Sequence, residues 1–172
     1  MQRLELYKNL STELLGELFF DPANSQHQTM RLAYATDASV YQELPEAVAI
    51  PHTQADLVTL IRFARQASVT LIPRTAGTSL AGQVVGNGIV VDVSRFFNKI
   101  LEVNVEEQWV RVEPGVIRDD LNHYLKSYGL MFGPETSTAS RAMVGGMIGN
   151  NSSGLHSIVW GDTRSNLIAA KL

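Results

Sequence analysis

The sequence contains no cysteine, which excludes disulfides, a cysteine nucleophile, a thiolate zinc site and an iron–sulfur cluster within its 172 residues. No apolar run approaches the roughly 20 residues that a membrane-spanning helix needs. No apolar leader follows Met1, so a cytoplasmic location is the default expectation. A net charge of -3 gives no strong positive balance to attract nucleic acid or anionic lipid. With these classes excluded, the sequence is expected to form a globular chain of one domain, or slightly more, with an apolar core.

The first 42 residues predict an N-terminal helical extension, placed before a domain that covers residues 43–172. Leucine and tyrosine recur at helical spacing through residues 3–20, and Pro22 would end this helix. We expect the helix to pack on the outside of the protein or on a partner. His27 follows in a polar stretch, where a lone histidine is expected to be solvated.

The domain begins with the pattern of a βαβ unit. Thr53 and Asp56 form a capping box that predicts the start of a helix, and the apolar face of that helix ends near Ser68. Short apolar runs before and after it predict buried strands. The three strands expected here are residues 47–50, 69–72 and 89–93.

The second half of the chain mixes a hairpin with helices. Apolar and polar residues alternate through 101–105 and 110–113, which predicts an antiparallel hairpin with one buried face. A helical stripe predicts a helix over 117–128, with His123 on its solvent side. The chain ends in an apolar run, residues 167–170, which predicts a further strand or helix and suggests that the chain is a fragment.

The sequence PRTAGTSLAGQ at residues 73–83 is the most informative stretch. Gly77 and Gly82 allow the backbone to approach a ligand closely. Successive backbone N–H groups can then converge on an anion, helped by the hydroxyls of Thr78 and Ser79. The stretch follows a predicted parallel strand, and ligands bind at the carboxyl ends of such strands. A pyrophosphate site is predicted, and a surface turn without a ligand is the alternative.

A second glycine-rich segment, VGGMIGNNSSG, occupies residues 144–154. It could be a flexible linker, but apolar residues among closely spaced small ones favour helix or turn backbone pressed against a planar ligand. Neither glycine segment contains G-x-G-x-x-G or G-x-x-x-x-G-K-[ST], so a Rossmann fingerprint and a P-loop are both absent.

The order of these motifs resembles the FAD-binding domain of the vanillyl-alcohol-oxidase family, also called PCMH-type or the FAD-linked oxidase N-terminal domain. The resemblance is to the branch of glycolate oxidase and D-lactate dehydrogenase. Besides the two glycine segments it includes TDASVY at 36–41, VEPGV at 112–116, GPE at 133–135, Gly161 and Thr163. It implies an α+β fold in which a small parallel βαβ subdomain precedes the start of a second α+β subdomain, truncated at the C-terminus.

The resemblance implies FAD as the cofactor and assigns it to matching positions. Arg74 would either offset phosphate charge or anchor its loop to the core. Thr78 stands where relatives that bind FAD covalently have histidine, so FAD is expected to be noncovalent. The residues implied in cofactor binding are Arg74, Ala76, Gly77, Thr78, Ser79, Gln83, Pro134, Glu135, Thr136, Ser137, Gly145, Gly146, Gly149, Asn150, Ser153 and Gly154. The two glycine segments are expected to contact opposite sides of one FAD molecule.

The activity implied is oxidation of a 2-hydroxy acid such as D-lactate, glycolate or D-2-hydroxyglutarate, by hydride transfer to flavin N5. The base and the carboxylate-binding cations are expected in a C-terminal cap domain outside this chain, so no catalytic residue is assigned, although His156 follows the second glycine segment. The fragment alone is expected to be inactive, and no metal site is predicted. An iron–sulfur module and association with a membrane through partners are further possibilities. The alternatives are an FAD enzyme acting on sugars or amino-sugar nucleotides, and a noncatalytic nucleotide-binding module.

Overall fold

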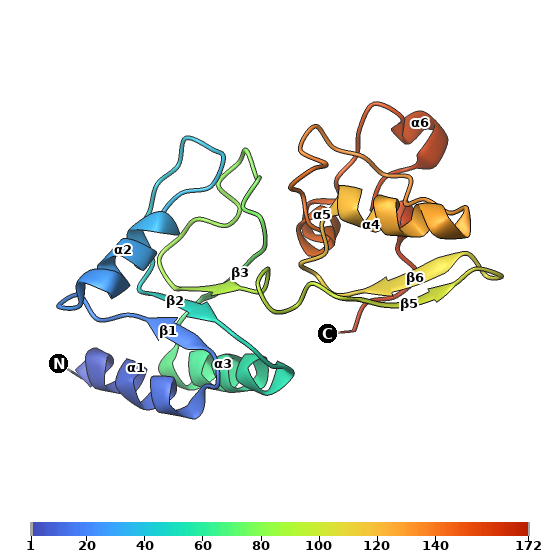
Figure 1. The fold of residues 1–172 in the computed structure, drawn as a ribbon. Coiled ribbons are helices and arrows are strands. Elements are labelled where there is room, and N and C mark those ends of the chain that lie inside the picture. The colour runs from blue at the N-terminus through green and yellow to red at the C-terminus, as the bar shows by residue number, and fades with distance from the viewer. Residues whose placement is uncertain (1, 172) are drawn as a thin grey trace. The chain divides into compact units, whose positions relative to one another are not determined.

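The computed structural model describes residues 2–171, which belong to two compact units, Met1–Phe96 (unit 1) and Phe97–Leu172 (unit 2). Figure 1 shows the elements of each unit. Unit 1 contains α1 (Gln2–Glu13), β1 (Glu17–Phe19), α2 (Ser25–Ala33), β2 (Ala47–Ile50), α3 (Gln54–Ala67), β3 (Leu71–Arg74) and β4 (Ile89–Asp92). Unit 2 contains β5 (Ile100–Asn104), β6 (Trp109–Val112), α4 (Arg118–Leu125), η1 (Lys126–Tyr128), α5 (Val144–Asn150), α6 (Ser157–Trp160) and η2 (Arg164–Asn166).

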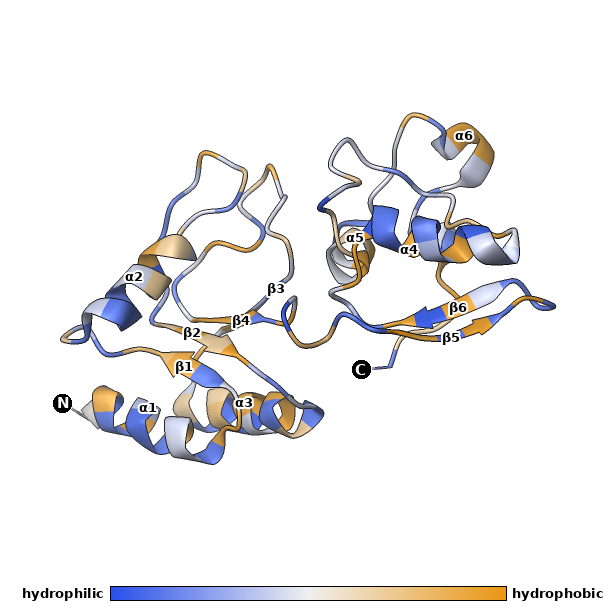
Figure 2. Cartoon of the chain, in the orientation of Figure 1, coloured by the Kyte–Doolittle hydropathy of each residue, from blue (hydrophilic) through white to orange (hydrophobic). Residues whose placement is uncertain are grey.

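Unit 1 is a four-stranded sheet in the order β1-β2-β4-β3, with helices on both faces. Strands β2, β4 and β3 are parallel, and β1 runs antiparallel to β2 at the edge. Every residue of β2 and β4 is buried, as expected of strands covered on both faces, and β2 is strongly apolar in Figure 2. Ala47 and Ala49 pack on one face with residues of α1 and α3, whereas Val48 and Ile50 pack on the other face with residues of α2.

The predicted βαβ unit is present, and its helix begins as expected. The Thr53 hydroxyl accepts a bond from the Asp56 N–H, and the Asp56 carboxylate accepts one from the Thr53 N–H, which completes the capping box of α3. The helix ends at Ser68, which adopts a left-handed conformation with φ 53°. Strand β3 begins two residues later than predicted, at Leu71.

The N-terminal segment differs from its prediction. The helix expected over 3–20 ends at Glu13, and Leu18 lies in strand β1. Gly16 lies between them, packed so closely on the end of β2 that a Cβ would be 2.9 Å from Pro51 Cα. Helical spacing could not reveal this long-range strand pairing. Helix α1 packs on the core of unit 1, where Tyr7 is buried against Phe63 of α3.

His27 is also not simply solvated. It lies in α2, a helix that the sequence analysis did not predict, and its Nδ1 accepts bonds from the backbone N–H groups of Phe20 and Asp21. Its ring meets the Phe19 ring edge to face, with 5.5 Å between centroids. His27 therefore fixes the end of β1 against α2.

Unit 2 is built on the antiparallel hairpin β5–β6, as predicted. Helices α4 and α5 supply Leu121, Leu125 and Val144 to a core that includes apolar residues of the hairpin. The helix predicted over 117–128 forms as α4 followed by η1, and His123 is exposed. Tyr124 and Tyr128 of this helix are 43% and 40% exposed.

The last described residues, 167–171, form neither the strand nor the helix that their apolar composition predicted. Within the described residues, no helix is both long enough and apolar enough to cross a membrane. The same residues contain no cluster of three or more side chains suited to holding a metal ion.

Candidate functional site

The glycine loop, residues 75–88, connects the parallel strands β3 and β4 and begins at the carboxyl end of β3. Among the described residues, none of the backbone N–H groups of residues 75–80 forms a hydrogen bond with another group of the chain. Further along, the Ser79 hydroxyl accepts bonds from the N–H groups of Ala81 and Gln83 and donates to the Gln83 side chain at 2.6 Å. The first part of the loop therefore offers a run of unpaired donors suited to an anion.

Two glycines give the loop its shape. Gly77 and Gly82 have φ values of 66° and 69°, in the left-handed region that side chains disfavour. A Cβ on Gly77 would lie 2.5 Å from the Arg74 guanidinium, and a Cβ on Gly82 would lie 2.7 Å from the Tyr41 ring. The positive φ favours glycine at both positions, and at Gly82 the Tyr41 ring also leaves no space for a Cβ.

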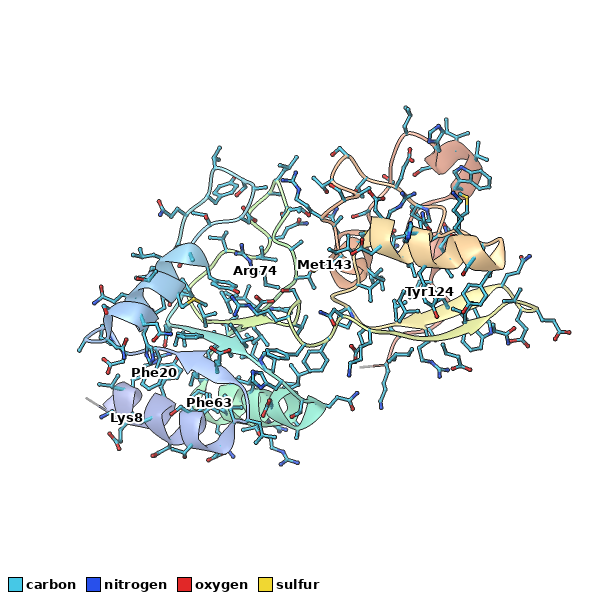
Figure 3. All side chains as sticks on the ribbon, in the orientation of Figure 1. Lys8, Phe20, Phe63, Arg74, Tyr124 and Met143 are labelled. Carbon is cyan, nitrogen blue, oxygen red and sulfur yellow. The ribbon has the colours of Figure 1, made fainter. Side chains whose placement is uncertain are left out.

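Arg74 is bound to the protein rather than extended into solvent. Its guanidinium donates to the carbonyl oxygen of Thr36 at 2.7 Å and, more weakly, to that of Tyr34 at 3.5 Å. Arg74, which Figure 3 labels, also lies over the Tyr34 ring, 5.1 Å from the centroid. Of the two roles considered for Arg74, these contacts favour the anchor.

A buried Tyr–Asp pair supports the same corner of unit 1. The Tyr34 hydroxyl donates to the carboxylate of Asp92, the last residue of β4, which is 4% exposed. Burial and the neighbouring Asp92 carboxylate raise the pKa of Tyr34, so the hydroxyl stays protonated and can donate. Neither residue was among the predicted site residues, although an aspartate closing the apolar strand IVVD was a usable signal.

In unit 2 the second glycine segment, residues 144–154, packs on two of the other predicted motifs. The Gly145 N–H donates to the Pro114 carbonyl at 2.8 Å, and a Cβ on Gly145 would lie 2.5 Å from the Pro114 Cβ. A Cβ on Gly154 would clash with the Glu135 carbonyl oxygen and lie 2.7 Å from the Glu135 Cγ. Close packing at these glycines brings together segments 112–116, 133–137 and 144–154.

Helix α5 has a buried side and a side of small residues. Val144 and Met147 are buried in the core of unit 2, whereas Gly146, Gly149 and Asn150 are exposed. A Cβ added to Gly149 would meet no atom within 4 Å. Gly149 is therefore not required by packing within unit 2, and the space beside it leaves room for a ligand to approach the helix backbone.

The turn after α5 is hydrogen-bonded to the segment that begins at Gly161. Asn151 adopts φ 48° and its side-chain amide donates to Asp162 at 2.9 Å. Thr163 is 2% exposed and its hydroxyl donates to the Ser152 carbonyl at 2.7 Å. Hydrogen bonds from Ser165 and Asn151 lower the pKa of Asp162 to about 2, so it remains charged and keeps these bonds at neutral pH.

His156 meets Glu135 directly. Its Nδ1 lies 2.6 Å from a Glu135 carboxylate oxygen, and the two side chains are 58% and 30% exposed. Of the neighbouring predicted residues, Pro134 is buried and its carbonyl accepts from Arg118 at 3.0 Å, whereas Ser137 is exposed. The structure thus places His156 beside the 133–137 segment.

Comparison with known proteins identifies related chains. The model of the family described as FAD binding domain matches residues 45–172. D-2-hydroxyglutarate dehydrogenase of Escherichia coli is 47% identical over 144 residues, which cover 82% of this chain and 14% of that protein. Glycolate oxidase subunit GlcD of Bacillus subtilis is 32% identical over 162 residues, covering 93% of this chain and 34% of that protein. The chain thus spans only a minor part of the curated relatives that it matches.

Solved structures share the fold. Alkyldihydroxyacetonephosphate synthase aligns with a TM-score of 0.79 at 21% identity, over 94% of this chain and 34% of that one. p-Cresol methylhydroxylase aligns with a TM-score of 0.74 at 13% identity, over 89% of this chain and 30% of that one. The predicted α+β, PCMH-type fold is confirmed.

Proposed function

Because the chain belongs to the family of FAD-binding domains, we propose that it binds FAD noncovalently as part of a flavin-dependent oxidoreductase that oxidises a 2-hydroxy acid. The observation that carries the proposal is the run of unpaired backbone N–H groups at residues 75–80. Such donors are suited to the two negative charges of a pyrophosphate, and they lie at the carboxyl end of a parallel strand.

The residues present fit FAD in both units. In unit 1, Gly77 and Gly82 adopt conformations that leave the loop backbone open to phosphate oxygens. In unit 2, the exposed Gly149 of α5 leaves room for a close approach, which is what a flat cofactor requires. We propose that one FAD contacts both segments, with the remaining implied residues of 133–137 along the flavin.

Bound FAD would supply the hydride acceptor. The chain's own residues would bind and orient it: backbone N–H groups of the glycine loop on the pyrophosphate, and the 133–137 and 144–154 segments on the rest. Thr78 offers no nucleophilic nitrogen for a covalent bond to the flavin, which supports noncovalent binding.

The substrate class comes from the relatives. Their names include D-2-hydroxyglutarate dehydrogenase, glycolate oxidase and D-lactate dehydrogenase, all of which name 2-hydroxy acids. We propose a substrate of that class, bound with the help of a cap domain that supplies the base and the carboxylate-binding cations. The iron–sulfur partner and the cytoplasmic location stay predictions.

Titration of the protein with FAD, followed by quenching of flavin fluorescence, tests cofactor binding. Acid precipitation should release the flavin into the supernatant; flavin retained in the pellet contradicts noncovalent binding. Anaerobic addition of D-2-hydroxyglutarate, D-lactate or glycolate to the full-length holoprotein should bleach the flavin absorbance, whereas sugars should not. Bleaching by sugars alone would favour the sugar-oxidase alternative, and the absence of FAD binding would leave a nucleotide-binding module without redox activity.

A further inference from the structure

Residues 35–43 form a closed turn beside the glycine loop in unit 1. The Glu43 N–H donates to the Ala35 carbonyl at 2.9 Å, and Thr36 pairs with Gln42 as an antiparallel bridge. Within the turn, an Asp37 oxygen accepts from the Ser39 N–H at 2.8 Å. This 35–43 turn contains the TDASVY motif, to which the family resemblance gave no role.

The 35–43 turn contacts the first glycine of the loop in two ways. The Ala38 N–H donates to the Gly77 carbonyl at 3.1 Å. Arg74, whose guanidinium lies against Gly77, donates to the Thr36 carbonyl at 2.7 Å. Because the guanidinium is held between the turn and Gly77, it fixes the position of one with respect to the other.

The same turn contacts the second glycine. The Tyr41 ring lies against Gly82, so closely that a Cβ would be 2.7 Å from one ring carbon and 3.1 Å from another. A shallow hollow of about 250 Å³ lies at this contact, lined by Tyr41, Gln42, Glu43, Ala81, Gly82 and Val85. The two positive-φ glycines on either side of Thr78 and Ser79 therefore contact one short stretch of chain.

We propose that the 35–43 turn is the positioning element of the FAD-binding loop. It holds Gly77 through Arg74 and Ala38, and Gly82 through Tyr41, so the unpaired N–H groups between them are arranged before FAD arrives. The inference rests on the proposed function. Under this proposal Arg74 acts on the loop and not on the phosphates. FAD affinity is higher because less entropy is lost in ordering the loop when FAD binds.

The test uses Tyr41→Ala and Arg74→Met in the full-length protein. Each variant should weaken FAD binding about tenfold, mostly through faster release. Hydrogen exchange of the apoprotein should rise at the bonded amides of Ala38, Ala81 and Gln83. Two control variants lose similar contacts elsewhere: Tyr124→Ala removes an exposed tyrosine of unit 2, and Arg31→Met removes a 2.9 Å bond to the Pro45 carbonyl. Both controls should leave the FAD dissociation constant unchanged, even where they lower the melting temperature.

The double variant separates positioning from direct phosphate contact. If Tyr41 and Arg74 position one loop, the combined variant should bind FAD about as weakly as the weaker single variant, because the loop is already released. Additive losses would mean that Arg74 contacts the phosphates itself, and would overturn its assignment as a positioning residue. Wild-type protein that binds FAD while Tyr41→Ala binds equally well and exchanges equally slowly would overturn the inference alone. Wild-type protein that fails to bind FAD would overturn the proposed function.

Discussion

Removal of the Asp56 carboxylate should selectively destabilise unit 1. This side chain is 2% exposed, and one oxygen accepts from the Leu15 N–H at 2.9 Å while the other accepts from the N–H groups of His52 and Thr53 at 2.8 Å and 3.1 Å. It therefore joins the start of α3 to the segment that leads into β1, 41 residues earlier in the sequence.

The size of the destabilisation follows from the backbone N–H donors that lose their acceptor. In Asp56→Ala three backbone N–H groups lose their acceptor, at about 1–3 kcal/mol each when they stay buried. Leu15 is 74% exposed, so water can reach its N–H and the low end of the range applies there. Part of this cost is offset, because the folded variant no longer has to bury a charged carboxylate. A destabilisation of about 2–4 kcal/mol is expected, and the Thr53 hydroxyl still caps the helix through its bond to the residue 56 N–H.

Hydrogen exchange followed by mass spectrometry resolves the two units. Peptides covering β2 and β4 should lose protection in Asp56→Ala, while peptides covering the β5–β6 hairpin should not. Asp120→Ala is the matched control, because Asp120 also lies in the first turn of a helix but is exposed, and its side chain makes no hydrogen bond within the described chain. A loss of less than fivefold in β2 and β4 protection, about 1 kcal/mol, would refute the reasoning.

The same carboxylate predicts a pH dependence. Burial alone would raise the pKa of Asp56, but the three backbone donors and the Thr53 hydroxyl hold it below its ordinary value of 3.8. The stability that it contributes is therefore complete above pH 3.8 and is lost as the pH falls through the lower folded-state value. Acid titration of β2 and β4 protection should show this loss in the wild type and a shallower one in Asp56→Ala.

Three further substitutions have defined outcomes. Leu60→Ala, at a fully buried position of α3, should destabilise unit 1 by about 2–5 kcal/mol in urea denaturation followed by hydrogen exchange, without changing protection of the unit 2 hairpin. Gly154→Ala must push the chain away from Glu135, so FAD affinity measured by fluorescence titration should fall more than about tenfold; unchanged affinity would show that this contact does not shape the site. Gly161→Ala forces a side chain into φ 74° and ψ -177°, which should cost about 1–3 kcal/mol and shift the emission of the adjacent Trp160.

Local patterns predicted the elements whose causes are local. The capping box of α3, the β5–β6 hairpin and the helix over 118–128 follow from residues within a turn or two of each other. The end of α1 does not, because Gly16 is required by contact with β2 residues far along the chain. Helix α2 was missed for another reason: its first turn is capped by Asn24 alone, and its sequence is polar.

The candidate site divides in the same way. Composition located both glycine segments, because glycines and other small residues can be read directly from the sequence. It could not reveal what holds them, because Tyr34 and Asp92 are 58 residues apart and Asn151 is 11 residues from Asp162. Whether both segments contact one FAD stays a prediction.

The strand order has a consequence for how the loop can vary. Strands β3 and β4 are parallel neighbours, so residues 75–88 must carry the chain from the end of one strand back to the start of the next. Such a return needs about a dozen residues or more and is usually made by a helix. Here the segment proposed to bind the pyrophosphate is itself the return path, so shortening it would break the sheet as well as the proposed site. Related chains should therefore tolerate exchanges of residue type in this stretch far better than deletions.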